Sequence, residues 1–286
     1  MKFVSACFLL FFSLCVYAQK TETLYLSGKG LGNTITWNFF CSSGHKSGKW
    51  SKIEVPSQWE LQGFGEYTYG RWYKTKGAVP SMETGLYRYS FKVPAAWKGK
   101  SIRIYFDGVM TDTDVKINGM SAGDTHQGGF YRFSYDITDK IKYGAKNQLE
   151  VFVRKHSLNK SVNAAERMAD WWTFGGIYRP VWLEAKPTSH IQHVAVDASS
   201  QGILSAKIQF NNLKKGCHLV ASIAPVGTDR GTFVPQSISL QDTVSVQRIS
   251  VNWKGVKTWT PETPNLYLMT LNLLNEKGEM IHTYQE

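Results

Sequence analysis

The sequence predicts an all-β chain made of two consecutive β-sandwiches. Apolar and polar residues alternate with period two from about residue 86 onward. The alternating segments are short, turns rich in Gly, Asn and Asp join them, and no stretch shows a long helical period. This pattern predicts a jelly-roll sandwich followed by an immunoglobulin-like sandwich.

Six strands are expected in the first sandwich. They cover residues 86–93, 101–106, 114–117, 130–137, 149–153 and 181–184. Asn118-Gly119 follows the third strand and predicts a hairpin, since both residues tolerate positive φ. The polar segment 159–170 interrupts the pattern, and a long loop inside a compact sandwich is usually functional.

A linker at residues 185–189 is expected to lead into the second sandwich. Its predicted strands cover residues 191–196, 203–210, 219–223, 244–251, 266–274 and 280–284, with a hairpin turn at 275–278. The length suits an immunoglobulin-like sandwich without the Cys-Trp-Cys signature. We therefore predict domains at 19–186 and 190–286.

The N-terminus has the features of a secretory signal peptide at residues 1–18. Lys2 precedes an apolar run, and Val16-Tyr17-Ala18 suits cleavage before Gln19. The run is short for a membrane span, and no later segment is apolar enough for one. A lipoprotein interpretation would use Cys7, which leaves almost no apolar run before it, or Cys15, which follows Leu rather than Gly or Ala. We expect a secreted or periplasmic protein without membrane insertion.

Charge and cysteine content exclude some classes of protein. The formal net charge is +11, yet Lys and Arg are scattered and no nucleic-acid motif is present, so no nucleic-acid partner is expected. Outside the predicted signal, Cys41 and Cys217 are far apart in sequence, and a disulfide between them is not expected. No Cys/His cluster has zinc spacing, so no metal site is predicted.

The segment Asp170-Trp171-Trp172 predicts a carbohydrate-facing loop. A carboxylate accepts hydrogen bonds from sugar hydroxyls, and an indole covers the apolar face of a sugar ring. Asp170 could instead cap a turn. In an extended backbone the two indoles point to opposite faces, so we expect one in a site and the other in the core. Gly175 and Gly176 are expected to permit a turn.

Other polar residues have weaker claims to a site. Arg179 is expected in a structural ion pair. The cluster of Asp107, Asp112 and Asp114 suggests a cation or, preferably, a polar hairpin rim. A loop holding His126 and Gln127 could contact sugar. Glu60 and Glu66 lie close in sequence, but nothing there supplies the raised pKa of an acid catalyst, so neither is interpreted as catalytic.

An ordered series of motifs links these segments. It comprises residues 50–60 (WSKIEVPSQWE), 85–91 (GLYRYSF), 106–109 (FDGV), 115–119 (VKING), 129–130 (GF), 135–138 (YDIT) and 175–181 (GGIYRPV). In order and spacing the series closely resembles the N-terminal part of glycoside hydrolase family 2, the family of β-galactosidase, β-glucuronidase and β-mannosidase. The resemblance covers roughly residues 48–186, with a galactose-binding-like jelly roll, and extends more weakly over 190–286.

The resemblance implies a further domain, a (β/α)₈ barrel with two glutamates that act by retention. The chain stops where that barrel would begin, so no catalytic residue is assigned in it. We expect this chain to be the front portion of an enzyme, or a truncated gene product. We expect it to be inactive alone. The full-length enzyme could form a homo-oligomer.

The resemblance also implies a sugar-binding role for one jelly-roll loop. Its acidic residue corresponds to Asp170, beside Trp171, and in some β-galactosidases this residue helps hold a monovalent cation. A second family contact, an Asn on an earlier loop, falls in residues 66–72, which contain no Asn. Tyr69 and Arg71 are the candidates there. Arg71 could favour an acidic or substituted sugar, or lie on the surface.

Three hypotheses follow for function. The first is the N-terminal portion of a secreted retaining β-glycosidase, β-galactosidase before the others, with a glycan substrate and no cofactor required by this segment. The second is a stand-alone carbohydrate-binding module or lectin-like domain. The third is a purely structural support for the barrel and for oligomer contacts.

Overall fold

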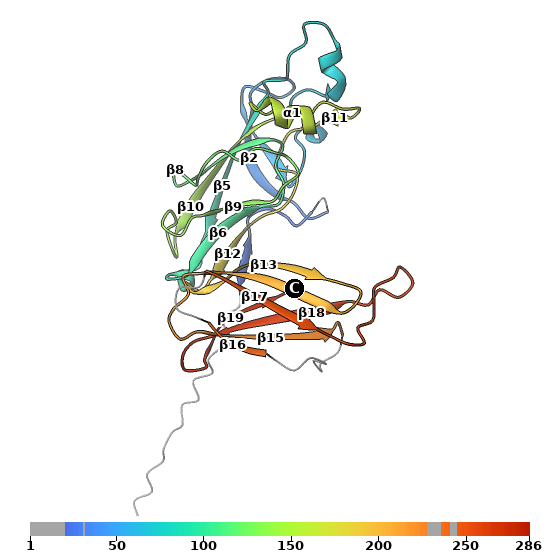
Figure 1. The fold of residues 1–286 in the computed structure, drawn as a ribbon. Coiled ribbons are helices and arrows are strands. Elements are labelled where there is room, and N and C mark those ends of the chain that lie inside the picture. Colours follow the sequence, from blue (N-terminus) through green and yellow to red (C-terminus); the bar gives the residue numbers. More distant parts are fainter. Residues whose placement is uncertain (1–20, 31, 228–235, 241–244) are drawn as a thin grey trace, which may run out of the picture. The chain divides into compact units, whose positions relative to one another are not determined.

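A computed structural model describes residues 21–286, except 31, 228–235 and 241–244. The predicted signal peptide lies outside the described residues. The chain forms two compact units, one at Glu22–Lys186 and one at Pro187–Glu286 with Thr21. Nearly all regular structure is β, as predicted, and every pairing between named strands is antiparallel (Figure 1). No helix of the described residues is long and apolar enough to cross a membrane.

Two large sheets form the body of the first unit. The four-stranded sheet has the order β1 (Glu22–Tyr25), β12 (Val181–Lys186), β6 (Ser101–Phe106) and β9 (Phe133–Asp136). The six-stranded sheet has the order β3 (Trp50–Val55), β2 (Ile35–Cys41), β5 (Thr84–Lys92), β10 (Lys146–Arg154), β7 (Asp112–Ile117) and β8 (Met120–Ser121). One apolar core joins both sheets, with Phe39, Tyr87 and Val151 from one and Ile104 and Leu183 from the other.

Alternation explains why these segments are strands. In β6 the residues alternate between half-buried and buried, so one face packs on the core. The predicted hairpin after β7 is confirmed, since Asn118 and Gly119 have φ of 52° and 82°. The predicted linker at 185–189 was too long, because Ala185 and Lys186 pair with β6 as the end of β12.

The polar segment 159–170 is not a loop throughout. It contains the helix α1 (Lys160–Glu166), which begins after Asn159, whose side chain accepts a hydrogen bond from Ser161 N at 2.9 Å. The seven residues of α1 are too few for a helical period to stand out in the sequence.

Three short 3₁₀ turns also occur among the described residues. They are η1 (Glu60–Gln62), η2 (Gly70–Lys74) and η3 (Ala95–Trp97).

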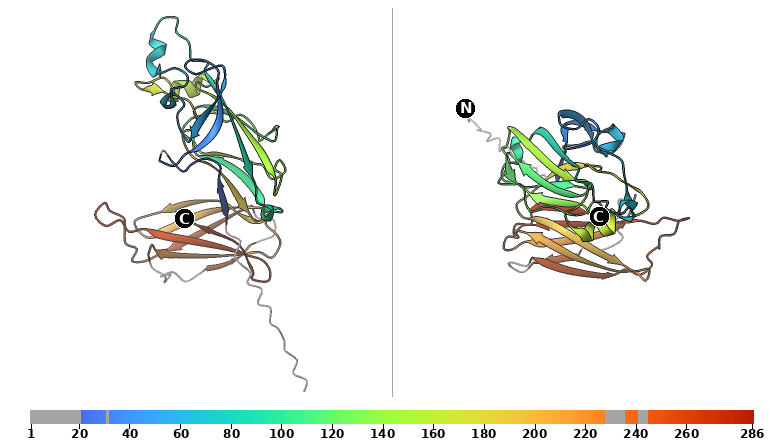
Figure 2. Two further views of the ribbon diagram at one scale, coloured as in Figure 1. Left: turned by 180° about the vertical axis from the view of Figure 1, so that it is seen from behind. Right: turned by 90° about the horizontal axis from the view of Figure 1, so that it is seen from above.

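A small ribbon projects beyond the two sheets. It pairs β4 (Thr68–Tyr69) with β11 (Trp172–Thr173), so that Tyr69 lies opposite Trp172. Figure 1 shows β11 beside α1 at one end of this unit, and the view from behind in Figure 2 agrees. The segment with the predicted site residues is therefore at an end of the sandwich.

The second unit is a sandwich of a three-stranded and a four-stranded sheet. The first has the order β13 (His190–Ala198), β14 (Ile203–Asn211) and β17 (Val246–Asn252). The second has the order β16 (Gln236–Ser239), β15 (His218–Pro225), β18 (Tyr267–Leu274) and β19 (Met280–Gln285). This strand content fits the predicted immunoglobulin-like class. Its core includes Ile208, Leu219 and Leu271, and the described residues of the two units contain no (β/α)₈ barrel.

Candidate functional site

The ribbon brings three predicted site residues together. Asp170 precedes β11, Tyr69 ends β4 and Arg71 follows in η2. The Tyr69 hydroxyl donates to Oδ1 of Asp170, and an Arg71 guanidinium nitrogen forms an ion pair with Oδ2. Residues about a hundred positions apart thus meet because β4 pairs with β11.

The carboxylate of Asp170 is accessible. Its side chain is 53% exposed and that of Arg71 is 46% exposed. Both carboxylate oxygens of Asp170 bond side chains from the segment around β4, namely Tyr69 and Arg71. A residue that caps a turn would instead bond backbone groups close to it in the chain. The hydrogen bond to Asp170 raises the pKa of Tyr69, because an ionised phenol could not donate it. An exposed carboxylate between a hydroxyl and a guanidinium offers both acceptors and donors to a polyhydroxylated ligand.

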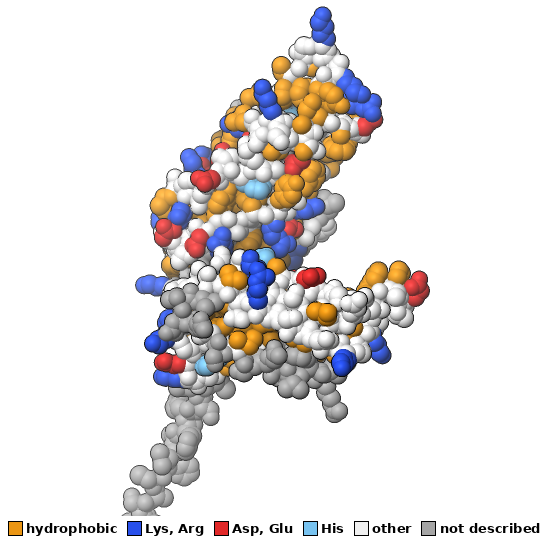
Figure 3. All heavy atoms as spheres, viewed as in Figure 1, with side chains coloured by type: hydrophobic (Ala, Val, Ile, Leu, Met, Phe, Trp, Pro, Cys, Tyr) orange, Lys and Arg blue, Asp and Glu red, His pale blue; other side chains and the backbone are white. Residues whose placement is uncertain are grey.

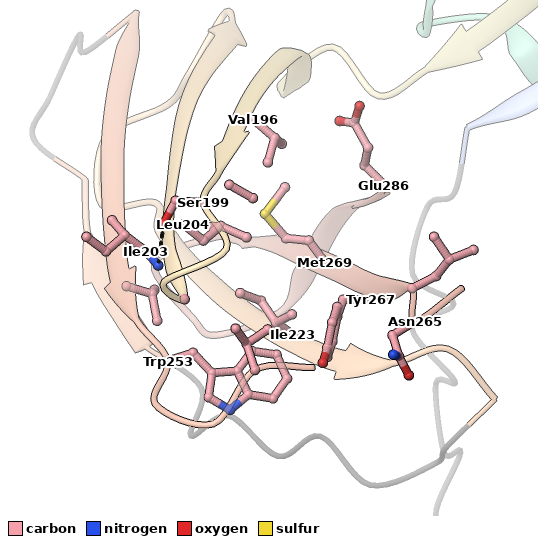
Figure 4. Close-up of a pocket in the computed structure, with 15 residues that line it drawn as sticks. Val196, Ser199, Ile203, Leu204, Ile223, Trp253, Asn265, Tyr267, Met269 and Glu286 are labelled. Atoms are coloured by element: carbon pink, nitrogen blue, oxygen red, sulfur yellow. Dashed lines mark hydrogen bonds between the residues drawn. The ribbon is translucent and has the colours of Figure 1, made fainter. Parts of the chain in front are cut away.

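Aromatic rings lie on one side of this polar group, next to Tyr69. Trp172 contacts Tyr69 edge-to-face with ring centroids 5.1 Å apart, and it contacts Tyr67 at 5.9 Å. Trp171 and Trp172 are 46% and 51% exposed, so neither indole is in the core. The expectation that one would be buried is wrong, since in β11 it is Thr173, and neither indole, that is buried. Figure 3 shows hydrophobic side chains gathered at the end that carries α1 and β11.

Tyr67 is a site candidate that the sequence reasoning missed. Trp171 contributes its carbonyl, which accepts from Gly70 N at 2.7 Å, and the indole of Trp172 is the one against Tyr69. Only the register of β4 against β11 places these rings together. Strands of two residues are too short for that register to be read from the sequence.

The glycine pair after β11 packs against the sandwich. A Cβ on Gly175 would overlap the indole of Trp59, which is fully buried. Gly176 has φ of 119°, a conformation that favours glycine, as predicted. Arg179 is exposed and its guanidinium lies 5.1 Å from the centre of the Tyr178 ring. Among the described residues it joins no salt bridge, so the expected ion pair is wrong.

Buried charges lie beneath the ribbon. Lys155 and Glu60 have no exposed side-chain surface, and Lys155 Nζ lies 2.8 Å from Glu60 Oε1 and 3.4 Å from Glu83 Oε1. Burial raises the pKa of Glu60, although Lys155 acts against this. Arg167 donates to the Lys155 carbonyl at 2.7 Å and to the Phe174 carbonyl. Burial lowers the pKa of Arg167 to about 10, so it stays charged near neutral pH.

The remaining candidates have structural partners. Glu66 is exposed and Glu60 is ion-paired, so they form no acid pair. His126 stacks on Phe133 with centroids 3.8 Å apart, and its Nε2 lies 2.9 Å from the Gly128 carbonyl oxygen. Asp112 Oδ2 accepts from Gln127 and from Leu158 N, Asp107 pairs with Arg132, and Asp114 accepts from Thr125, so the three carboxylates have no partner in common.

Both carboxylate oxygens of Asp170 have a partner within this chain. Arg71 already puts positive charge on one carboxylate oxygen, and Tyr69 uses the other. Within the part of the chain that the structure describes, no three His, Cys, Asp or Glu side chains gather as a metal site. A monovalent cation near Asp170 in the full enzyme stays a prediction.

The comparisons with known proteins agree on the family. The sequence pattern of the glycosyl hydrolases family 2 sugar binding domain matches residues 42–187, and a second pattern of the same family matches 189–286. A β-galactosidase of Thermoanaerobacter pseudethanolicus is 33% identical over 207 residues, 69% of this chain and 27% of that protein. A putative β-glucuronidase of Formosa agariphila is 29% identical over 245 residues, 82% of this chain and 27% of that protein.

Solved structures show the same fold. A β-glucuronidase from Bacteroides uniformis has a TM-score of 0.68 at 23% identity, over 93% of this chain and 32% of that one. A β-glucuronidase from Bifidobacterium dentium complexed with coumarin-3-O-glucuronide has a TM-score of 0.68 at 19% identity, over 93% and 47% of the two chains. The chain spans about a quarter of the length of the curated relatives it matches.

Proposed function

Since this chain belongs to glycosyl hydrolases family 2, we propose that it forms the non-catalytic side of a sugar-binding site in a retaining β-glycosidase. The observation that supports this most directly is the exposed group of Asp170, Tyr69 and Arg71 on the ribbon. The two catalytic carboxylates of such an enzyme would lie outside this chain.

Asp170 is the proposed acceptor for sugar hydroxyls. A charged carboxylate forms stronger hydrogen bonds than a neutral acceptor, and its two oxygens can accept from neighbouring hydroxyls at once. Tyr69 and Arg71 hold the carboxylate in place while leaving it half exposed. The ring of Trp172, or that of Trp171, would cover the apolar face of the sugar.

The proposed substrate is a β-galactoside or a β-glucuronide. The names of the relatives include both activities. Arg71 supports the acidic sugar, because a guanidinium with free donors beside Asp170 can bind a second carboxylate. The apolar N-terminal run after Lys2 supports export to the periplasm or the medium.

A stand-alone carbohydrate-binding module is the second candidate. The half-exposed rings of Tyr67, Tyr69 and Trp172 support it, because exposed aromatics beside a carboxylate can bind a glycan without a catalytic domain. The two functions differ in affinity. One side of a pocket should bind a glycan with a dissociation constant above about 1 mM, which corresponds to about −4 kcal/mol. A complete module should have a dissociation constant of about 1 mM or below.

The experiment is a titration of the isotopically labelled 286-residue protein with methyl β-galactoside and methyl β-glucuronide, followed by NMR. The expected result is weak binding, with shifts confined to the indole and amide signals of the ribbon. Asp170→Asn should abolish these shifts, and Asp107→Asn, which loses a different exposed ion pair, should retain them. Ribbon signals that ignore both sugars would contradict the role of Asp170, and saturation below about 1 mM would favour the module.

A further inference from the structure

The ribbon that carries the candidate site is too short to hold its own position. Each of its strands has two residues, and an isolated pair of strands of that size is unstable in water. Its outer side chains are largely exposed, so little apolar burial stabilises it there. Something at the base of the ribbon must therefore determine where Asp170 and Arg71 lie.

Three buried charged residues lie at that base. Lys155, Glu60 and Glu83, here called the buried triad, have side chains at most 2% exposed. Among the described residues, none of their side-chain nitrogen or oxygen atoms lacks a hydrogen-bond partner. A fully satisfied buried network is rigid and specifies one arrangement, although it adds little net stability compared with an apolar core.

The buried triad bonds the backbone before β4. Glu66 N donates to Glu83 Oε2 at 2.8 Å, and Lys155 Nζ donates to the Glu66 carbonyl. Both backbone groups of one residue are therefore held by charged side chains, two positions before Thr68. The Trp59 indole donates to Glu83 Oε1 at 2.6 Å and fixes that carboxylate in turn.

The same triad bonds the backbone after β11. Gly175 N lies 3.0 Å and 3.1 Å from the two carboxylate oxygens of Glu60, two positions beyond Thr173. Lys155 is shared by both carboxylates, so it joins the base of β4 to the base of β11. Charge-assisted bonds of this kind are about twice as strong as neutral ones.

We infer that Lys155, Glu60 and Glu83 are positioning residues that set the ribbon, and with it the spacing of Asp170 and Arg71. Glu83 holds the β4 side, Glu60 holds the β11 side, and Lys155 couples the two. The inference rests on the proposed function only in taking the ribbon to carry a sugar-binding site. Its test needs no glycan, so its failure is distinct from failure of the sugar-binding proposal.

The test is amide hydrogen exchange, measured by NMR on the 286-residue protein and on two isosteric variants. Glu60→Gln leaves Lys155 paired with Glu83, and Glu83→Gln leaves it paired with Glu60, so each removes one charge without orphaning the lysine. The control is Glu150→Gln, which removes the same charge from the Arg88–Glu150 pair in the six-stranded sheet.

We expect local effects. Glu60→Gln should accelerate exchange at Gly175 at least about tenfold, equivalent to about 1.4 kcal/mol, and Glu83→Gln should do the same at Glu66. The Gly70 amide, which bonds Trp171 across the ribbon, should accelerate in both. Core amides of β5 and β10 should change less than about twofold, and the control should change none of these amides.

Two outcomes would overturn the inference. Equal acceleration in the ribbon and in the core strands would give the buried triad a general role in stability only. Unchanged exchange at Glu66 and Gly175 would give it no role in the ribbon. If one variant does not fold, the other carries the test. In the unaltered protein the amides of Glu66 and Gly175 should exchange as slowly as core amides. Fast exchange at these two amides would refute the inference without any variant.

Discussion

Lys155 Nζ lies 2.8 Å from Glu60 Oε1, and neither side chain has exposed surface. Lys155 follows the end of β10 and Glu60 begins η1, and their bonds to Glu66 and Gly175 reach the residues next to both strands of the ribbon. Removing one partner of a buried ion pair leaves an uncompensated charge in a medium that solvates it poorly. The stability of this unit should therefore depend on Lys155 more than on any exposed cation.

Lys155→Met should lower the free energy of unfolding by about 3–5 kcal/mol, because both Glu60 and Glu83 lose their cation. Urea denaturation followed by circular dichroism measures this. Arg88→Met, from a pair that is 44% and 27% exposed, is the control and should cost less than about 1 kcal/mol. Similar losses in the two variants would contradict the prediction.

His156 should make stability fall as the pH is lowered. Burial, with help from Arg167 and Lys155, lowers its pKa to about 3, so the folded protein keeps it neutral while the unfolded chain protonates it near pH 6.5. Between these values the unfolded state binds more protons, and stability declines by up to about 1.4 kcal/mol per pH unit. His156→Phe should flatten this dependence in denaturation curves from pH 7 to pH 4. An unchanged slope would show that other groups cause it.

Gly175→Ala should destabilise the protein by about 1–3 kcal/mol, because the new methyl group would overlap the buried indole of Trp59. Thermal unfolding measures the loss. Gly30→Ala is the matched control, since no atom lies within 4 Å of the added carbon and its backbone is not left-handed. A melting temperature unchanged in Gly175→Ala would mean that Trp59 can move aside.

The 286-residue protein should not hydrolyse 4-nitrophenyl β-galactoside or the matching glucuronide. In the described residues the buried carboxylates Glu60 and Glu83 are held by Lys155, and Asp170 is held by Arg71 and Tyr69. None is left as a matched acid and nucleophile. Release of nitrophenolate above the buffer rate, retained through further purification, would refute this; a family 2 β-galactosidase of full length is the positive control.

Much of the fold could be predicted from residues near one another in the sequence. Alternation located β6 and β10, and the Asn118-Gly119 pair located a hairpin, because side-chain direction and turn conformation are local properties. The helix α1 and the ribbon strands could not be found this way, since each is too short for its period to appear.

The sequence by itself determined the two all-β units, the family and the choice of Asp170, Tyr69 and Arg71 as candidates. Only the tertiary structure decided that these three side chains meet, that both Trp171 and Trp172 are exposed, and that Lys155 joins Glu60 to Glu83 beneath them. The physical reason is sequence separation. Strand pairing and buried charge networks join residues tens of positions apart, and neither periodicity nor turn chemistry records which distant groups they bring together.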